Sequence, residues 1–91
     1  EVQELSASMY PNPLNGNNLL LSIELPEEGD VQIQLFDLAG RILYNSELAG
    51  KAAGEHAFKF SREELGLTSV GIYLVQVKSG DRLFQTKLRV E

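Results

Sequence analysis

The chain has 91 residues and a formal net charge of −5, and it contains no cysteine. That length suits one domain with a single modest core, and the missing cysteines exclude a disulfide framework, a thiolate metal site and a cysteine nucleophile. The negative charge argues against a nucleic-acid partner, no apolar run approaches the ~20 residues of a transmembrane segment, and the first residues do not read as a signal peptide.

The N-terminal segment runs into two prolines. Residues 2–9 alternate weakly between apolar and polar side chains, and Tyr10, Pro11, Asn12 and Pro13 follow them. Each proline lacks an amide donor and keeps the preceding residue extended, so this motif does not fit inside a central strand. Residues 1–9 are therefore either a linker or a first edge strand, and the folded domain is expected over residues 10–91.

Four strands are predicted in the middle of the chain by alternating apolar residues. They cover residues 19–25, 31–35, 41–48 and 55–60. Asp37 begins a type I turn that requires a positive φ at Gly40, and Arg41 opens the strand that follows. Loops are expected at residues 26–30 and 49–54. Ser61 and Glu64 have the spacing of a capping box, which is long enough here for one helical turn.

The last two predicted strands, residues 72–78 and 83–90, form a hairpin. They flank Gly80 and Asp81, which are a strong signal for a two-residue turn. This turn sets a register in which one face is nearly all apolar and pairs Val77 with Phe84, Val75 with Thr86 and Tyr73 with Leu88. The opposite face carries Gln76, Gln85, Leu74, Lys87 and Arg89. One face therefore suits a core, and the other is mixed and partly basic.

About seven short strands, with turns roughly every 8 to 12 residues and no long helix, are typical of one architecture. The sequence predicts an all-β fold, an immunoglobulin-like antiparallel β-sandwich, without the Cys and Trp hallmarks of antibody domains.

Few side chains suggest chemistry. His56 is the only histidine, and we interpret it as a rim or surface residue near a strand end. A hydrolase that used it with Ser61 or a carboxylate would need a further group to orient the base. The acidic loop with Glu27, Glu28 and Asp30 is interpreted as solvated, since it lacks the spacing of a dedicated calcium loop. No serine-hydrolase or nucleotide-binding motif occurs. The sequence predicts no enzyme, no catalytic residue and no cofactor.

Four motifs, taken in order, resemble a known family. The Tyr10 to Pro13 motif comes first, residues 31–41 follow, then Gly71 and Tyr73 in a glycine-tyrosine motif, and finally Lys87 near the end of the sequence. This order and spacing resemble the C-terminal sorting domain of type IX (Por) secretion cargo over about residues 9–91.

The resemblance implies a non-catalytic domain that follows a cargo protein in a Gram-negative bacterium. Such a domain passes through the periplasm and directs its cargo across the outer membrane to the cell surface or the medium. The outer-membrane translocon or a shuttle protein recognises it, and a sortase-like peptidase usually removes it. Carried over by motif, the recognition residues would be Gly71, Tyr73, Lys87, Leu88, Arg89, Val90 and Glu91.

A physical hypothesis accompanies the resemblance. If the last strand lies at a sheet edge, its unpaired backbone groups and the side chains of Lys87 and Arg89 can bind a receptor by strand addition. The alternative function is a passive immunoglobulin-like or fibronectin-like spacer or adhesion module of an extracellular enzyme, because fold alone does not separate these two classes.

Overall fold

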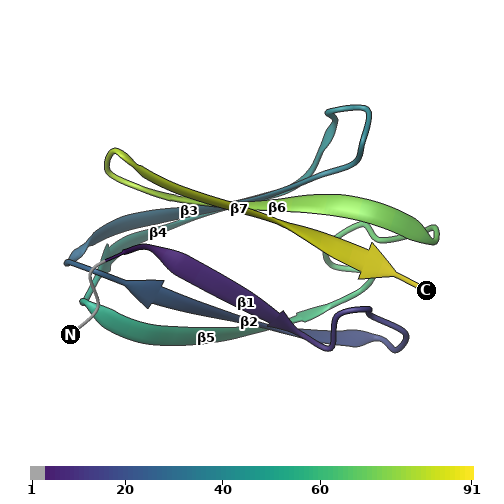
Figure 1. Cartoon of the computed structure of the whole chain (residues 1–91), viewed down its shortest axis with the longest axis horizontal. Helices are drawn as coiled ribbons and strands as arrows, with labels where there is room; N and C mark the ends of the chain where they lie inside the picture. Colours follow the sequence, from purple (N-terminus) through teal and green to yellow (C-terminus); the bar gives the residue numbers. More distant parts are fainter. Residues whose placement is uncertain (1–3) are drawn as a thin grey trace.

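Two antiparallel sheets pack face to face in a computed structural model that describes residues 4–91 (Figure 1). One sheet has the order β1-β2-β5, with β1 at Ser6–Tyr10, β2 at Asn18–Leu25 and β5 at Gly54–Ser61. The other has the order β4-β3-β6-β7, with β4 at Ile42–Lys51, β3 at Gly29–Phe36, β6 at Gly71–Ser79 and β7 at Arg82–Val90. The described residues form seven strands and no helix, so the predicted β-sandwich is confirmed.

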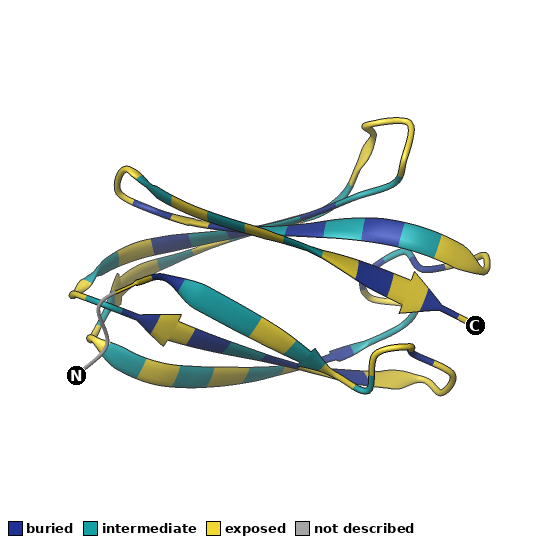
Figure 2. Ribbon diagram, in the orientation of Figure 1, coloured by how far each residue is buried: buried dark blue, intermediate teal, exposed yellow. Residues whose placement is uncertain are grey.

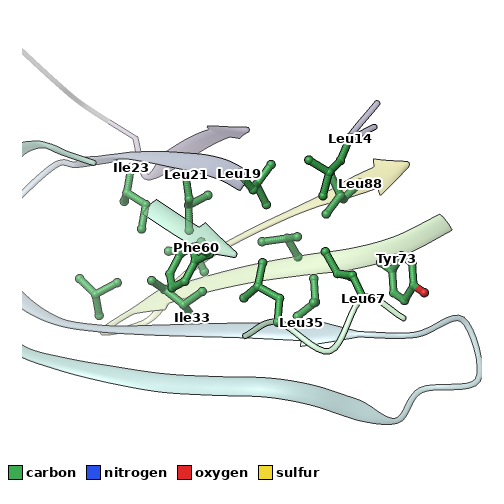
Figure 3. Packing of buried hydrophobic residues seen from close by; sticks show 14 of the residues in the cluster. Leu14, Leu19, Leu21, Ile23, Ile33, Leu35, Phe60, Leu67, Tyr73 and Leu88 are labelled. Atoms are coloured by element: carbon green, nitrogen blue, oxygen red, sulfur yellow. The ribbon is translucent and has the colours of Figure 1, made fainter. Parts of the chain in front are cut away.

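The core lies between the two sheets because apolar residues recur at every second position of the strands. Bands of buried and exposed residues alternate along the ribbons in Figure 2, and β2, for example, buries Leu19, Leu21, Ile23 and Leu25. Two loop residues, Leu14 and Leu67, complete the core and are almost fully buried (Figure 3). Among residues 4–91, no helix is long and apolar enough to cross a membrane.

The strand boundaries differ from the predicted ones at two loops and at the N-terminus. Strand β3 begins at Gly29, β4 continues to Lys51, and β5 begins at Gly54. The loops expected at 26–30 and 49–54 are therefore shorter than predicted. Gly29 pairs with Lys51, and the Asp30 Oδ1 accepts a hydrogen bond from the Gly50 N–H at 2.9 Å. Backbone pairing thus extends the strands through residues of low strand propensity. Of the segment expected as a linker or a first edge strand, residues 1–3 lie outside the described residues, and Ser6–Tyr10 forms β1 at the edge of its sheet.

Both predicted turn motifs form their expected hydrogen bonds. The Gly40 N–H donates to the Asp37 carbonyl at 3.0 Å, and Gly40 has a φ of 90°. In the capping box, the Ser61 N–H donates to Glu64 Oε1 at 3.2 Å and the Glu64 N–H donates to Ser61 Oγ at 3.0 Å. The capping box therefore closes a single turn and starts no helix.

The terminal hairpin has the predicted register. Val77 pairs with Phe84, Val75 with Thr86 and Tyr73 with Leu88, and Ser79 faces Arg82 across the two turn residues. Gly80 has a φ of 61°, whereas Asp81 is not among the residues with positive φ. A positive φ at the first central position alone belongs to a type II′ turn, which matches the twist of the flanking strands.

Candidate functional site

The predicted recognition residues converge at one end of the sandwich, where β7 ends beside the segment that follows β1 (Figure 1). Strand β7 lies at the edge of its sheet and pairs with β6 on one side. An edge strand ordinarily leaves its outer N–H and C=O groups open to another strand. At the end of β7, however, these outer backbone groups are already hydrogen-bonded.

Asn12 and Leu14, which we call the edge clamp, occupy the outer side of β7. The Asn12 Nδ2 donates to the Lys87 carbonyl, and the Arg89 N–H donates to the Asn12 Oδ1, both at 3.1 Å. The Leu14 N–H donates to the Arg89 carbonyl, and the Glu91 N–H donates to the Leu14 carbonyl, both at 2.7 Å. These four backbone groups of β7 and Glu91 are therefore paired, and strand addition at this position would first have to displace the edge clamp.

Arg62 holds the loop and the chain end together from a third segment. Its Nε donates to the Gly16 carbonyl at 3.0 Å, and its Nη2 lies 3.4 Å from the Leu14 carbonyl and 3.1 Å from the Glu91 carbonyl. A guanidinium group suits this role because it presents several donors in a fixed plane. Neither Arg62 nor Leu14 is marked by a local sequence pattern, since their partners at the chain end lie far away along the sequence.

The predicted recognition residues divide into buried and exposed groups. Tyr73, Leu88 and Val90 are buried in the core, and the Tyr73 hydroxyl donates to the Ser69 carbonyl at 2.6 Å. These three side chains cannot touch a receptor without opening the fold, so any role they have in recognition would act through the shape of the strand pair. Gly71 is exposed at the start of β6 with a φ of 144°, a conformation that favours glycine.

The exposed group, Lys87, Arg89 and Glu91, lies at the outer surface. The Arg89 Nε is 3.6 Å from the Glu91 Oε2 in a pair that remains well exposed, so this contact contributes little to stability. Lys87 pairs with Leu74 of β6 on the face that points away from the core. Both cations are thus accessible on a strand whose backbone is fixed on its two sides.

The structural motif residues fall at the ends of the sandwich. Tyr10 is strongly exposed, and the peptide bonds before Pro11 and Pro13 are both cis. The Asp37 Oδ1 accepts from the N–H groups of Ala39 and Arg41, and its Oδ2 contacts the Arg41 Nε at 2.7 Å. The backbone hydrogen bond from Arg41, together with its guanidinium group, holds the pKa of Asp37 below the ordinary value of 3.8. Gly80 and Asp81 form the tip of the β6–β7 hairpin, at the end of the sandwich opposite the edge clamp.

The other candidate residues form no reactive group. His56 is half-buried, and its Nε2 lies 2.7 Å from the Ala52 carbonyl. Ser61 lies at the other end of β5, five residues away and therefore about 16 Å along the strand. The acidic loop is dispersed, since Asp30 accepts from Gly50 and Glu27 pairs with Arg82 at 3.7 Å. Within residues 4–91, no three side chains are grouped to hold a metal ion.

Comparison with known proteins supplies the context for this geometry. A family model described as a secretion system C-terminal sorting domain matches residues 8–91, which include the edge clamp, Arg62 and all of β7. No curated protein is similar enough to the chain to match.

Proposed function

Because this chain belongs to the family of secretion system C-terminal sorting domains, we propose that its exposed terminal strand is the part that the type IX machinery recognises. The family is that of the C-terminal signal domains of type IX secretion, and it is non-catalytic. Membership favours a sorting function over the spacer or adhesion module that the fold alone also allows. It implies recognition by the secretion machinery and a cargo that is secreted or displayed at the cell surface.

The proposed partners are those of a sorting signal. A cargo domain precedes this domain, the outer-membrane translocon or a shuttle protein binds it, and a sortase-like peptidase removes it after passage through the periplasm. The order of the four sequence motifs supports this assignment. Gly71 and Tyr73 would shape the recognition end, and Lys87, Arg89 and Glu91 would make the contacts.

One observation carries the proposal: the end of β7 is an edge strand whose backbone is fixed by β6 on one side and by the edge clamp on the other. Fixed backbone groups hold the Cα–Cβ bonds of Lys87 and Arg89 in a constant arrangement, so that both side chains leave the strand at fixed positions. A preorganised surface of this kind binds with less loss of conformational freedom than a frayed chain end.

A localisation assay tests the proposal. The domain is fused to a periplasm-directed fluorescent protein in a type IX-competent host, as the wild type and as a Lys87→Ala/Arg89→Ala double variant. A Lys51→Ala/Lys59→Ala variant removes the same charge from other strands and serves as the control. We expect export of the wild type and of the control, and retention of the double variant in the periplasm. Equal export of all three would refute a recognition role for the two cations.

A further inference from the structure

The outer face of the four-stranded sheet carries a row of apolar side chains that ends in a lysine. Ile42 of β4 pairs with Phe36 of β3, Phe36 pairs with Leu74 of β6, and Leu74 pairs with Lys87 of β7. Directly paired residues share one face of a sheet, and Leu35, the neighbour of Phe36, points into the core. The row therefore faces outward and crosses all four strands.

A second pair lies next to this row, Ile72 of β6 with Arg89 of β7. Together the six residues form a surface that we call the outer patch: Phe36, Ile42, Ile72, Leu74, Lys87 and Arg89. Ile42 is 56% exposed, and Phe36, Ile72 and Leu74 are half-buried by their neighbours within the sheet. The β3–β4 hairpin, which projects at this end of the sandwich (Figure 1), adds the exposed Leu38 close by in sequence.

Polar side chains bound the outer patch. The next row along the same face consists of amides, from Asn45 through Gln34 and Gln76 to Gln85. The Gln76 Nε2 donates to the Gln34 Oε1 at 3.2 Å. Glu47 lies beyond this row, opposite Gln32. The same row continues from Gln32 to Lys78 of β6 and Leu83 of β7, which is 57% exposed. Four apolar and two basic side chains thus lie at the end of the sheet where β7 is clamped, whereas the row beyond the amides carries one of each.

The outer face of the three-stranded sheet differs in composition. Its positions are mostly small or acidic: Ser6, Ser8, Ser22, Glu24, Glu55 and Ala57. Tyr10, Leu20 and Lys59 form one row there and resemble the outer patch on a smaller scale. Because Glu24 and Glu55 share that face, an acidic partner would be repelled there, whereas the carboxylate of Glu47 is separated from the outer patch by the amide row.

We propose that the outer patch is the docking surface for the secretion machinery, and that the partner presents apolar side chains flanked by carboxylates. This inference rests on the proposed function. The edge of β7 is closed at this end by Asn12 and Leu14, so the side-chain face is the surface left for contact. The exposed cations Lys87 and Arg89 attract the carboxylates of the partner to this end of the sheet. The Glu91 carboxylate, 3.6 Å from Arg89, offsets part of that charge, so the attraction rests mainly on Lys87.

The test uses matched variants of the fluorescent fusion in the type IX-competent host. Ile42→Thr/Leu74→Thr removes apolar surface from the outer patch while keeping strand propensity, and Leu20→Thr is its control on the other sheet. Lys87→Glu reverses a patch charge, Lys59→Glu changes the net charge equally, and Lys87→Arg retains the cation. We expect export to fall about tenfold or more in the two patch variants, as for the loss of a central contact residue. The controls and Lys87→Arg should remain near wild type.

The outcomes separate the inference from the function on which it rests. If the wild-type fusion stays in the periplasm while another sorting domain is exported, the proposed function fails. Thermal unfolding establishes that the patch variants are folded. If folded patch variants are exported as well as the wild type, the outer patch is not the docking surface. Vesicles of anionic phospholipid provide a further check with the purified domain. Binding to them that Lys87→Glu abolishes would replace the protein partner with a membrane surface.

Discussion

At the scale of single residues, Leu14 is the clearest case of a side chain whose role is set by distant contacts. It follows two prolines in a loop, yet it is fully buried beside Leu88 (Figure 3). We expect Leu14→Ala to lower the free energy of unfolding by about 2–5 kcal/mol, because it leaves a cavity in the core. Leu20→Ala, at a 37% exposed strand position, should cost about 1 kcal/mol or less. Urea unfolding of both variants measures the difference, and equal costs would contradict the burial of Leu14.

Asp37 is the residue whose ionisation should respond to pH. Its pKa lies below the ordinary value of 3.8 because it accepts the Arg41 N–H and contacts the guanidinium group. The unfolded chain therefore takes up this proton at a higher pH than the folded chain does. The stabilisation by Asp37 is complete above about pH 5 and is lost as the pH falls through the lowered pKa.

Replacement by asparagine should reveal this effect. We expect wild type to be more stable than Asp37→Asn near neutral pH, with the difference shrinking as the pH falls below 3.8. NMR titration of the Asp37 carboxyl group gives the pKa directly, and denaturant unfolding at several pH values gives the stability difference. A carboxyl pKa at or above the ordinary value would contradict the turn geometry.

At the scale of the elements, the edge clamp makes a prediction about the end of β7. Asn12→Ala removes two hydrogen bonds, to the Lys87 carbonyl and from the Arg89 N–H, and should lower stability by about 1 kcal/mol. Amide hydrogen exchange by NMR should show faster exchange at Arg89, while Val77, which is paired with β3 on one side and β7 on the other, stays protected. Asn15→Ala, in the same exposed loop, is the matched control. Unchanged exchange at Arg89 would show that the clamp does not hold the strand.

The effect of Asn12→Ala on export also separates two modes of recognition. If the receptor docks on the side-chain face, freeing the edge of β7 should leave export unchanged or reduce it. If the receptor instead adds a strand to that edge, removing its competitor should increase binding, since Asn12 and Leu14 occupy the same backbone groups. A rise in export would therefore favour strand addition over docking on the outer patch.

What could be predicted from sequence follows from how far apart the interacting residues lie. The β6–β7 register was predictable because the Gly80-Asp81 turn and the flanking alternation are adjacent in the chain and agree. The order of the strands within the sheets was not, since nothing local places β5 beside β2 or β6 beside β3. The edge clamp was equally hidden, because Asn12 and Lys87 are 75 residues apart. The motif order marked Asn12 as a family position without revealing its contacts.

Burial also changes the meaning of the predicted recognition residues. The resemblance placed seven of them near the terminal strand, and the structure divides these by exposure: Leu88 and Val90 belong to the core, whereas Lys87 and Arg89 face outward. Alternation along a strand predicts such a division once the inward face is known. The hairpin register already placed Leu74 on the face of Lys87, but the contribution of β3 and β4 to the outer patch was not predictable, because Phe36 and Ile42 reach Lys87 only through the pairing of four strands.

At the scale of the whole molecule, this division determines how a truncation should be interpreted. A domain of 91 residues has a total stability of roughly 5–14 kcal/mol. Deleting residues 87–91 removes Leu88 and Val90, which are 0% and 2% exposed, and such core losses cost about 2–5 kcal/mol for a leucine alone. It also leaves Asn12, Leu14 and Arg62 without their partners at the chain end. The summed loss approaches the entire stability of the domain.

We therefore expect the domain without residues 87–91 to be largely unfolded at 25 °C. The Lys87→Ala/Arg89→Ala variant should instead unfold cooperatively within a few degrees of wild type, because exposed substitutions cost about 0.5 kcal/mol or less. Far-UV circular dichroism during heating distinguishes the two. Loss of export by the truncated domain would then report unfolding, and loss by the double variant would report recognition. If the truncated domain instead melts cooperatively near the wild-type temperature, the last strand is not required for the core, and its deletion becomes a direct test of recognition.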